Sequence, residues 1–365
     1  MIRMGRGLSL YLELMRALAA LAVLLGHMRL YADPDIPAIL GNHHQEAVAF
    51  FFVLSGFVIR FVTVEREASW RSYVAARAAR LYSVVPLAIL VTLVCDAATL
   101  ALAPQILADR YYFDGPGDLP DVLSSMIFAN ELWLSHVVLG SNIPFWSLGF
   151  EVCYYIFFGL ALYLDGRARW LALAAWALIC GPKIILYLPL WMLGVGAYEL
   201  LYRYRLLSGR RTVGMILFGG SALAYLILKY GLFAGAEYGI FHVRDGDQML
   251  RTWTYFHGIG LCAAMNIVGF ALLFGKRAAL LQWCRRPIKW LSGASFTLYL
   301  MHLPVLFLLM AIVPDGGQGI AGLLIIFAGT IGIVLLLAEL GERRKHVYAA
   351  ALGAILPRAR RRAAG

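Results

Sequence analysis

The stretch MRALAALAVLLGHM, residues 15–28, decides the fold class. It belongs to an apolar run over roughly residues 8–30, which is long enough to cross the hydrocarbon core of a membrane as a helix. The same run carries Arg16 and His27. A basic side chain is costly inside a membrane and usually serves a function, so these two residues are the first candidates for a site.

The composition extends this interpretation to the whole chain. Of the 365 residues, 61% are hydrophobic and 15% are charged, and the mean hydropathy is +0.74. Soluble domains carry about 25% charged residues. Apolar segments recur at residues 8–30, 47–64, 82–103, 146–164, 168–180, 184–202, 212–232, 251–274, 290–312 and 319–340. We therefore expect an all-α, polytopic integral membrane protein with about ten transmembrane helices, the fifth of them short or broken at Gly181-Pro182.

The positive charges predict the orientation. If the N-terminus lies in the cytoplasm and the segments alternate, 24 of the 32 Lys and Arg residues fall on the inside and four on the outside. This asymmetry follows the positive-inside rule and places both termini in the cytoplasm. We expect a transmembrane domain over residues 1–345, a basic cytoplasmic tail over 346–365, and a multi-pass location in a cell membrane. The net charge of +11 then needs no nucleic-acid partner.

Two outside loops, 104–145 and 233–250, are expected to shape the choice of an outer ligand. The first loop contains a semi-apolar piece, residues 121–140, which we expect to form an interfacial or re-entrant helix rather than a span. The five cysteines are widely spaced, and no His or Cys pair has the spacing of a metal site, so no metal is expected.

Arg16 and His27 are 11 residues apart, which places them on one helix face, about 16 Å apart along the axis. Arg16 then lies in the cytoplasmic half and His27 near the outer surface. The alternative is a structural pair between Arg16 and Glu13, with His27 as an interfacial histidine.

The cytoplasmic side offers two more candidates. Arg77 and Arg80 share a face at the membrane surface, where they could anchor lipid headgroups or bind the phosphates of an anionic ligand. Ser55 and Gly56 lie in FFFVLSGFVIR, residues 50–60, where small residues allow close helix packing or a break in the helix.

Further polar residues occur in later segments. Glu151 ends NIPFWSLGFE, about one and a half turns inside the outer boundary, and a carboxylate at that depth is a functional candidate or an ion-pair partner. Ser295, Tyr299 and His302 form a polar stripe on LSGASFTLYLMHLPVL. A single buried histidine is usually structural, but polar stripes on several segments favour a common site.

Together these motifs resemble bacterial acyltransferase family 3, a family of transmembrane O-acyltransferases. The resemblance rests on Arg16-x10-His27, FFVLSGF, Arg77-x-x-Arg80, WSLGFE and SFTLYLMHLP, which occur in the family's order. The chain departs from the family before the paired phenylalanines, where many members have an aspartate and this chain has EAVAFFF. Whether Glu46, His43 or His44 replaces that aspartate is left open.

The resemblance implies an acyl-CoA donor, acetyl-CoA or another, on the cytoplasmic side and a hydroxyl acceptor outside, on a glycan, glycolipid or secreted small molecule. The resemblance also implies that the membrane is the bacterial inner membrane. No permanently bound cofactor is expected, and membrane lipids are the other partners. His27 would act as general base with Glu151 orienting it, and Arg16 would meet the donor. The donor-binding candidates are Arg77, Arg80, Ser55 and Gly56. The acceptor-site candidates are Trp146, Asn130, Ser295, Tyr299 and His302.

Two other classes of function remain open from the sequence. A sugar or lipid transporter also uses intramembrane charges, although transporters often show two related halves, which this chain does not. A membrane sensor or scaffold would use its polar residues only as structural glue, and it would not bind acyl-CoA.

Overall fold

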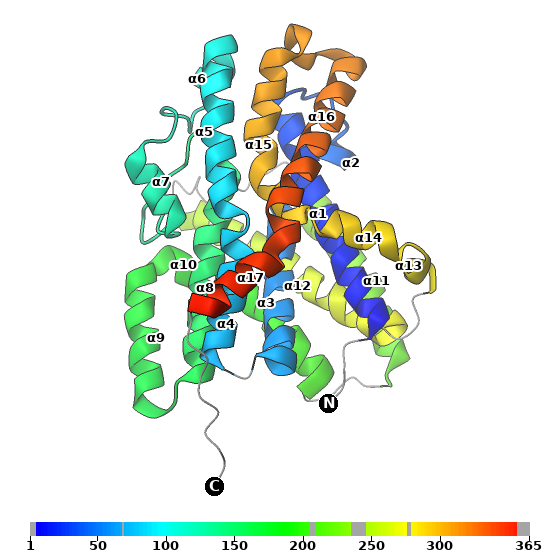
Figure 1. The fold of residues 1–365 in the computed structure, drawn as a ribbon. Helices are drawn as coiled ribbons and strands as arrows, with labels where there is room; N and C mark the ends of the chain where they lie inside the picture. The colour runs from blue at the N-terminus through cyan, green and yellow to red at the C-terminus, as the bar shows by residue number, and fades with distance from the viewer. Residues whose placement is uncertain (1–4, 68, 204–208, 235–245, 276–278, 356–365) are drawn as a thin grey trace.

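The computed structural model describes residues 5–67, 69–203, 209–234, 246–275 and 279–355. Within these ranges every regular element is a helix, which confirms the all-α expectation (Figure 1). The α-helices are α1 (Arg6–Tyr31), α2 (Ala38–Gly41), α3 (His44–Arg66), α4 (Trp70–Tyr82), α5 (Val85–Leu102), α6 (Gln105–Ala108), α7 (Leu119–Met126), α8 (Trp146–Tyr163), α9 (Gly166–Cys180), α10 (Pro182–Tyr198), α11 (Arg211–Ile227), α12 (Gly246–Phe274), α13 (Ala279–Trp283), α14 (Arg285–Ser292), α15 (Ser295–Ile312), α16 (Gly319–Leu340) and α17 (Lys345–Ile355).

The fifth expected segment is the short one, as the sequence indicates. In the described ranges nine helices are long and apolar enough to cross a membrane. The predicted segment 168–180 forms α9, which has 15 residues and ends at Gly181, in the left-handed region at φ 82°. Pro182 begins α10, so the chain turns here and α9 ends after 15 residues.

The piece at 121–140 also differs from the expectation. Only its start is helical, in the eight-residue α7, and the chain from 127 to 142 is irregular. The reason is a set of buried polar partners for this segment. Asp96 of α5 accepts from the backbone N–H of Ser141 at 2.8 Å and from its hydroxyl at 2.5 Å. The Asn142 side-chain amide donates to Thr92 and to the Leu300 carbonyl. The end of this segment is therefore bonded to α5 and α15, and its polar groups have partners without a helix.

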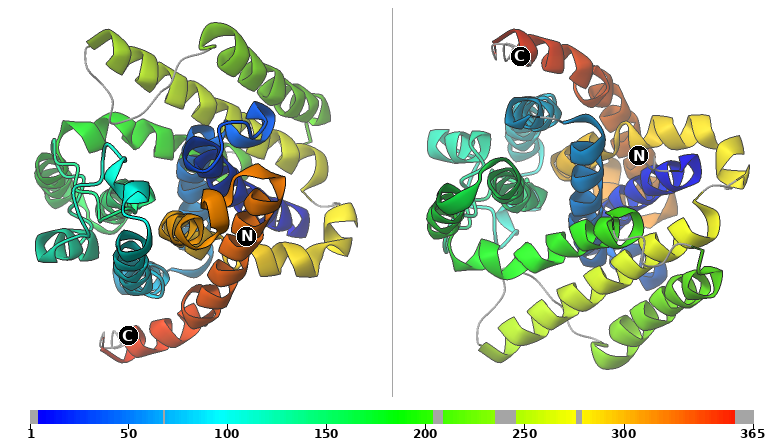
Figure 2. Two further views of the ribbon diagram at one scale, coloured as in Figure 1. Left: turned by 90° about the horizontal axis from the view of Figure 1, so that it is seen from above. Right: turned by 90° about the horizontal axis from the view of Figure 1, so that it is seen from below.

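The centre of the bundle is α3, which packs against α1, α10 and α12 (Figure 2). The close approach of α3 and α10 depends on glycine. A Cβ at Gly56 would collide with the Trp191 carbonyl, and a Cβ at Gly194 would collide with the Val53 carbonyl. Small residues let two membrane helices pack backbone to backbone.

The segments that the charge pattern predicts to be cytoplasmic lie on one side of the molecule. The start of α1 and helices α4 and α17 all lie in the lower half of Figure 1. Glu342, which follows α16, accepts hydrogen bonds from the N–H groups of Phe296 and Thr297 at 3.1 and 2.9 Å and caps α15. The predicted tail is helical as far as Ile355, and residues 356–365 lie outside the described ranges, as do residues 235–245 of the second outer loop.

Candidate active site

A cavity lies among α1, α3, α4, α8 and α15. Phe51, Phe52 and Phe296 form much of its apolar wall. Its polar lining consists of Arg16, Ser55, Arg80, Ser147, Glu151, Ser295 and Tyr299. Pieces of five sequence motifs therefore meet in one place, as the polar stripes of the sequence suggest.

Two arginines give the cavity a positive character. Arg80 Nη2 is 4.0 Å from Oε1 of Glu151, and the Arg80 guanidinium lies 5.6 Å from the centre of the Phe296 ring. Arg16 has no carboxylate within 4.0 Å among the described residues, so it does not form the structural pair with Glu13. Two guanidinium groups beside one carboxylate favour an anionic ligand with phosphate or carboxylate oxygens.

Glu151 is held on the wall of the cavity by two hydroxyl groups. The Ser55 hydroxyl of α3 donates to Oε1 at 2.6 Å, and the Tyr155 hydroxyl, one turn further along α8, donates to the same oxygen. These bonds join α3 to α8. They also satisfy a carboxylate that would otherwise be unpaired in an apolar interior.

His27 of α1 pairs with His302 of α15. Nδ1 of His27 is 2.7 Å from Nε2 of His302. On its other side, Nδ1 of His302 lies 2.8 Å from the Leu298 carbonyl oxygen and 3.0 Å from that of Tyr299. Glu151, which the sequence analysis assigned to orient His27, contacts Ser55, Tyr155 and Arg80 instead.

This chain of contacts defines the tautomers of a neutral pair. A carbonyl oxygen only accepts, so Nδ1 of His302 carries the hydrogen and its Nε2 is the acceptor. His27 must then donate from Nδ1. Nε2 of His27 is left without a hydrogen and can accept a proton.

The histidine pair lies just beyond the outer end of the cavity. On α15, His302 follows the lining residue Tyr299 by three positions. On α3, the lining residue Val48 is one turn after His44, whose ring centre is 5.5 Å from that of His27. Arg16 and His27 share α1 with about 16 Å between them. Along α1, Arg16 thus lines the cationic cavity, and Nε2 of His27 lies about three turns further toward the predicted outer side.

The residues around Glu46 form a separate cluster. Glu46 pairs with Lys229 at 2.5 Å and accepts from the Tyr255 hydroxyl, while His43 bonds the Tyr225 hydroxyl. Glu46 thus joins α3 to Lys229, which follows α11, and to Tyr255 of α12. Of the three residues left open at this position, only His44 lies beside His27.

A second cavity lies on the predicted outer side. It is lined by Tyr111, Tyr112, Asp114, Asp121, His136, Val137, Val138 and Ile143. The Tyr112 ring is 6.3 Å from that of Tyr31, which in turn is 5.8 Å from His27. Burial raises the pKa of the Asp121 carboxyl, and the nearby carboxylates of Asp118 and Asp114 act in the same direction.

The walls of this outer cavity are fixed by buried ion pairs. Glu131 is fully buried, pairs with Lys183 at 2.5 Å and lies 2.7 Å from Nδ1 of His136. A buried pair of this kind holds its loop in one arrangement, because breaking it would leave a charge without compensation.

The family model described as "Acyltransferase domain" matches residues 9–339, which is most of the chain and nearly all of the predicted transmembrane domain. This chain belongs to that acyltransferase family. The resemblance found in the sequence is thereby confirmed. Acyltransferase MdmB of Streptomyces mycarofaciens is 30% identical over 189 residues, which cover 48% of this chain and 46% of that protein. The chain thus matches less than half the length of this relative, and no solved structure matches it.

The acyltransferase places four of the predicted residues away from its cavity. Gly56 packs on α10, and Trp146 packs edge-on against Phe52 and Phe150. Asn130 is fully buried within the irregular 127–142 segment, and its side-chain amide has no hydrogen-bond partner in the described part of the chain.

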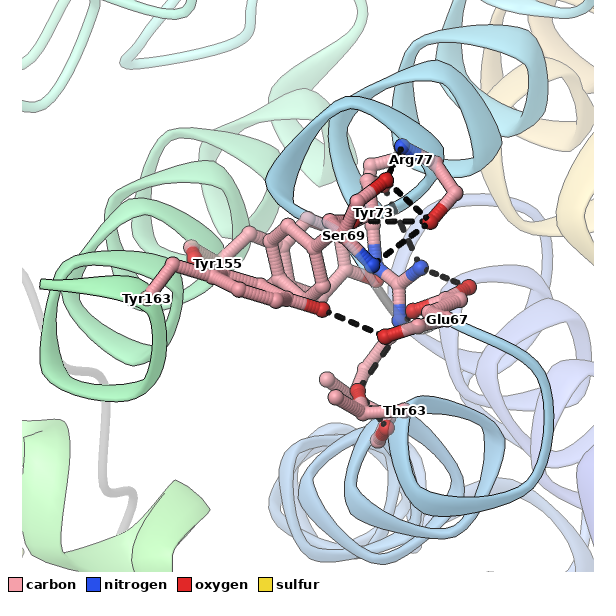
Figure 3. Close-up of polar contacts among 9 residues, drawn as sticks. Thr63, Glu67, Ser69, Tyr73, Arg77, Tyr155 and Tyr163 are labelled. Carbon is pink, nitrogen blue, oxygen red and sulfur yellow. Dashed lines mark hydrogen bonds and ion pairs between the residues drawn. The ribbon is translucent and has the colours of Figure 1, made fainter. Parts of the chain in front are cut away.

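The fourth is Arg77, whose side chain lies between Tyr73 and Glu67 (Figure 3). It forms an ion pair with Glu67 and does not line the cavity, whereas Arg80 does.

Sequence reasoning missed three residues of this acyltransferase that matter for the site. Tyr155 is four positions after Glu151, a spacing that would have placed both on one helix face. Ser147 bonds the Tyr299 hydroxyl at 2.8 Å, and Glu67 pairs with Arg77 across a turn between helices. The last two contacts join different helices, and no spacing within one segment predicts them.

Proposed function

We propose that this acyltransferase moves an acyl group, acetyl in the simplest case, from cytoplasmic acyl-CoA to a hydroxyl group outside the bacterial cell membrane. The acceptor would be a glycan, a glycolipid or a secreted small molecule. Membership of the family supports acyl transfer in a multi-pass membrane protein. The observation that carries the proposal is the order along α1, with a cationic cavity first and a histidine with a free ring nitrogen beyond it.

The donor would enter from the cytoplasmic end. Arg80, at the end of α4, would pair with a phosphate of the donor, and Glu151 keeps its guanidinium at the cavity wall. Arg16 lies in the same cavity without a carboxylate partner among the described residues, so it is available to the thioester carbonyl oxygen. The apolar wall would surround the acyl chain.

The chemistry then needs one base. Nε2 of His27 would take the proton from the acceptor hydroxyl as its oxygen attacks the thioester carbon. A carbon–oxygen ester bond forms, the carbon–sulfur bond breaks, and the proton passes from His27 to the leaving CoA thiolate. His302 would keep His27 in the tautomer that this step requires. The step needs no acyl-enzyme.

The acceptor would occupy the outer cavity. Tyrosine rings and carboxylates suit a polyhydroxylated group, because the rings cover its apolar face and the carboxylates accept from its hydroxyls. The Tyr112 and Tyr31 rings connect this cavity to His27.

The test uses purified protein in nanodiscs with acetyl-CoA and an envelope glycolipid extract of the native host. Release of free CoA thiol is followed in the wild type, in His27→Ala and in His346→Ala, whose histidine is exposed on α17. We expect release that depends on the extract, persists in His346→Ala and falls by about 10²- to 10⁴-fold in His27→Ala. Full release in His27→Ala would contradict the proposed base.

A further inference from the structure

The turn between α3 and α4 is held by a buried ion pair. Nη1 of Arg77 donates to Oε1 of Glu67, and the two side chains are 7% and 4% exposed (Figure 3). The Arg77 guanidinium also lies 4.1 Å from the centre of the Tyr73 ring. Thr63, one turn before the end of α3, donates its hydroxyl hydrogen to the Ile59 carbonyl at 2.6 Å, and this hydroxyl lies 3.4 Å from the other oxygen of Glu67. Both ends of the turn therefore contact one carboxylate.

The same turn is tied to α8. The Tyr163 hydroxyl donates to the Glu67 carbonyl at 2.9 Å, and the Tyr73 hydroxyl donates to the Tyr155 carbonyl at 2.7 Å. Figure 3 shows the side chains of Tyr73 and Tyr163 between α4 and α8. These two hydrogen bonds thus join the turn, α4 and α8 into one unit.

This unit leads directly to the cavity. The Tyr155 hydroxyl donates to Glu151, and Arg80 follows Arg77 by three positions on α4. The Arg80 side chain is 30% exposed and lines the cavity, while Arg77 is buried and faces the turn. The two arginines of one sequence motif therefore have different surroundings.

We infer that Arg77 is a positioning residue, which acts through Glu67 and Tyr73 to set Arg80 and Glu151 for the donor, and that it does not bind the donor. This inference rests on the proposed function.

Two nitrogens of Arg77, Nε and Nη2, are buried without a hydrogen-bond partner among the described residues. Because both nitrogens are shielded from solvent, a donor phosphate would reach them only after the packing around the buried Arg77–Glu67 pair had opened. Such an opening is unfavourable, because protein interiors are close-packed.

The test measures the Kd for acetyl-CoA by equilibrium dialysis, and the thermal unfolding midpoint, in nanodiscs. The variants are Glu67→Gln, Arg77→Gln, both together, and Arg80→Gln. Glu67→Gln is close in shape and leaves Arg77 in place. We expect Glu67→Gln and Arg77→Gln each to raise the Kd about tenfold. The Kd of the double variant should be no higher than the higher of the two single-variant values, because both substitutions remove the same contact. Arg80→Gln should raise the Kd with the midpoint unchanged.

Two patterns would overturn the inference. If Arg77 binds the donor itself, Arg77→Gln raises the Kd while Glu67→Gln leaves it at the wild-type value. If the pair only stabilises the fold, both variants lower the midpoint and leave the Kd unchanged. A wild type that binds acetyl-CoA but transfers nothing contradicts the proposed function alone, and a wild type that does not bind it contradicts both.

Discussion

At the scale of the residue, the account depends on which nitrogen of His27 carries a hydrogen. The His302 ring determines this, because its Nδ1 is committed to two backbone carbonyls of α15. A histidine in the other tautomer would present an N–H to the acceptor hydroxyl and could not take its proton.

Replacing His302 by phenylalanine tests this point. The ring shape is nearly kept, but His27 loses the acceptor that fixes its tautomer. We expect the turnover rate to fall by about 10²-fold or more, while the Kd for acetyl-CoA stays within twofold. An unchanged turnover rate in His302→Phe would show that the pair has no part in catalysis.

A second residue, Tyr112, lies where the outer cavity meets the ring of Tyr31. In Tyr112→Ala we expect the KM for the glycolipid extract to rise about tenfold, with the Kd for acetyl-CoA unchanged, because only the acceptor would lose a contact. Tyr348→Ala, on α17, is the matched control. A rise in the donor Kd instead would place Tyr112 outside the acceptor path.

At the scale of the element, the site depends on how closely α3 and α10 approach each other. Gly56 and Gly194 let the two backbones touch, and Ser55, beside Gly56, is thereby set against Glu151. Adding a methyl group at the crossing would push α10 away from α3.

Gly194→Ala measures this contact. We expect a loss of about 1–3 kcal/mol in the free energy of unfolding, and a lower thermal midpoint, since the new Cβ meets the backbone of α3. Gly196→Ala is the control on the same helix, because nothing lies within 4 Å of a Cβ there. Equal midpoints in the two variants would contradict the backbone contact.

The helices themselves were largely predictable, whereas the contacts between them were not. Apolar runs mark the spans because a membrane requires about 20 apolar residues in a helix. The apolar run that ends at Cys180 forms a helix of only 15 residues. The 127–142 segment is irregular, and Asp96 and Thr92 of α5 bond the polar groups at its end. The sequence alone does not show that Asp96 and Thr92 are the partners of this segment, because they lie on another helix.

The site shows the same division. Motifs along single helices named Arg16, Arg80, Glu151, Tyr299 and His302, and all of them lie at the cavity or at the histidine pair. The pairings His27–His302 and Glu67–Arg77 join residues from different elements, so spacing within one segment could not predict them.

At the scale of the whole molecule, the charge distribution gives the membrane orientation. Two cysteine variants test it in a Cys284→Ser background, since the other four natural cysteines are buried. A membrane-impermeant thiol reagent should label Asp109→Cys in intact cells and Ser72→Cys only after permeabilisation, because the first lies in the outer loop and the second near the start of α4. The reverse pattern would invert the donor and acceptor sides.

The most direct measurement follows the acyl group itself. Acetyl-CoA labelled in its acetyl group is supplied to the reconstituted protein with the glycolipid extract, and the label is then sought in the extract as a base-labile ester. The account predicts such an ester with the wild type and with His346→Ala, and its loss with His27→Ala. Ester formation by His27→Ala at the wild-type rate, or no labelled ester with any acyl-CoA donor, would contradict it.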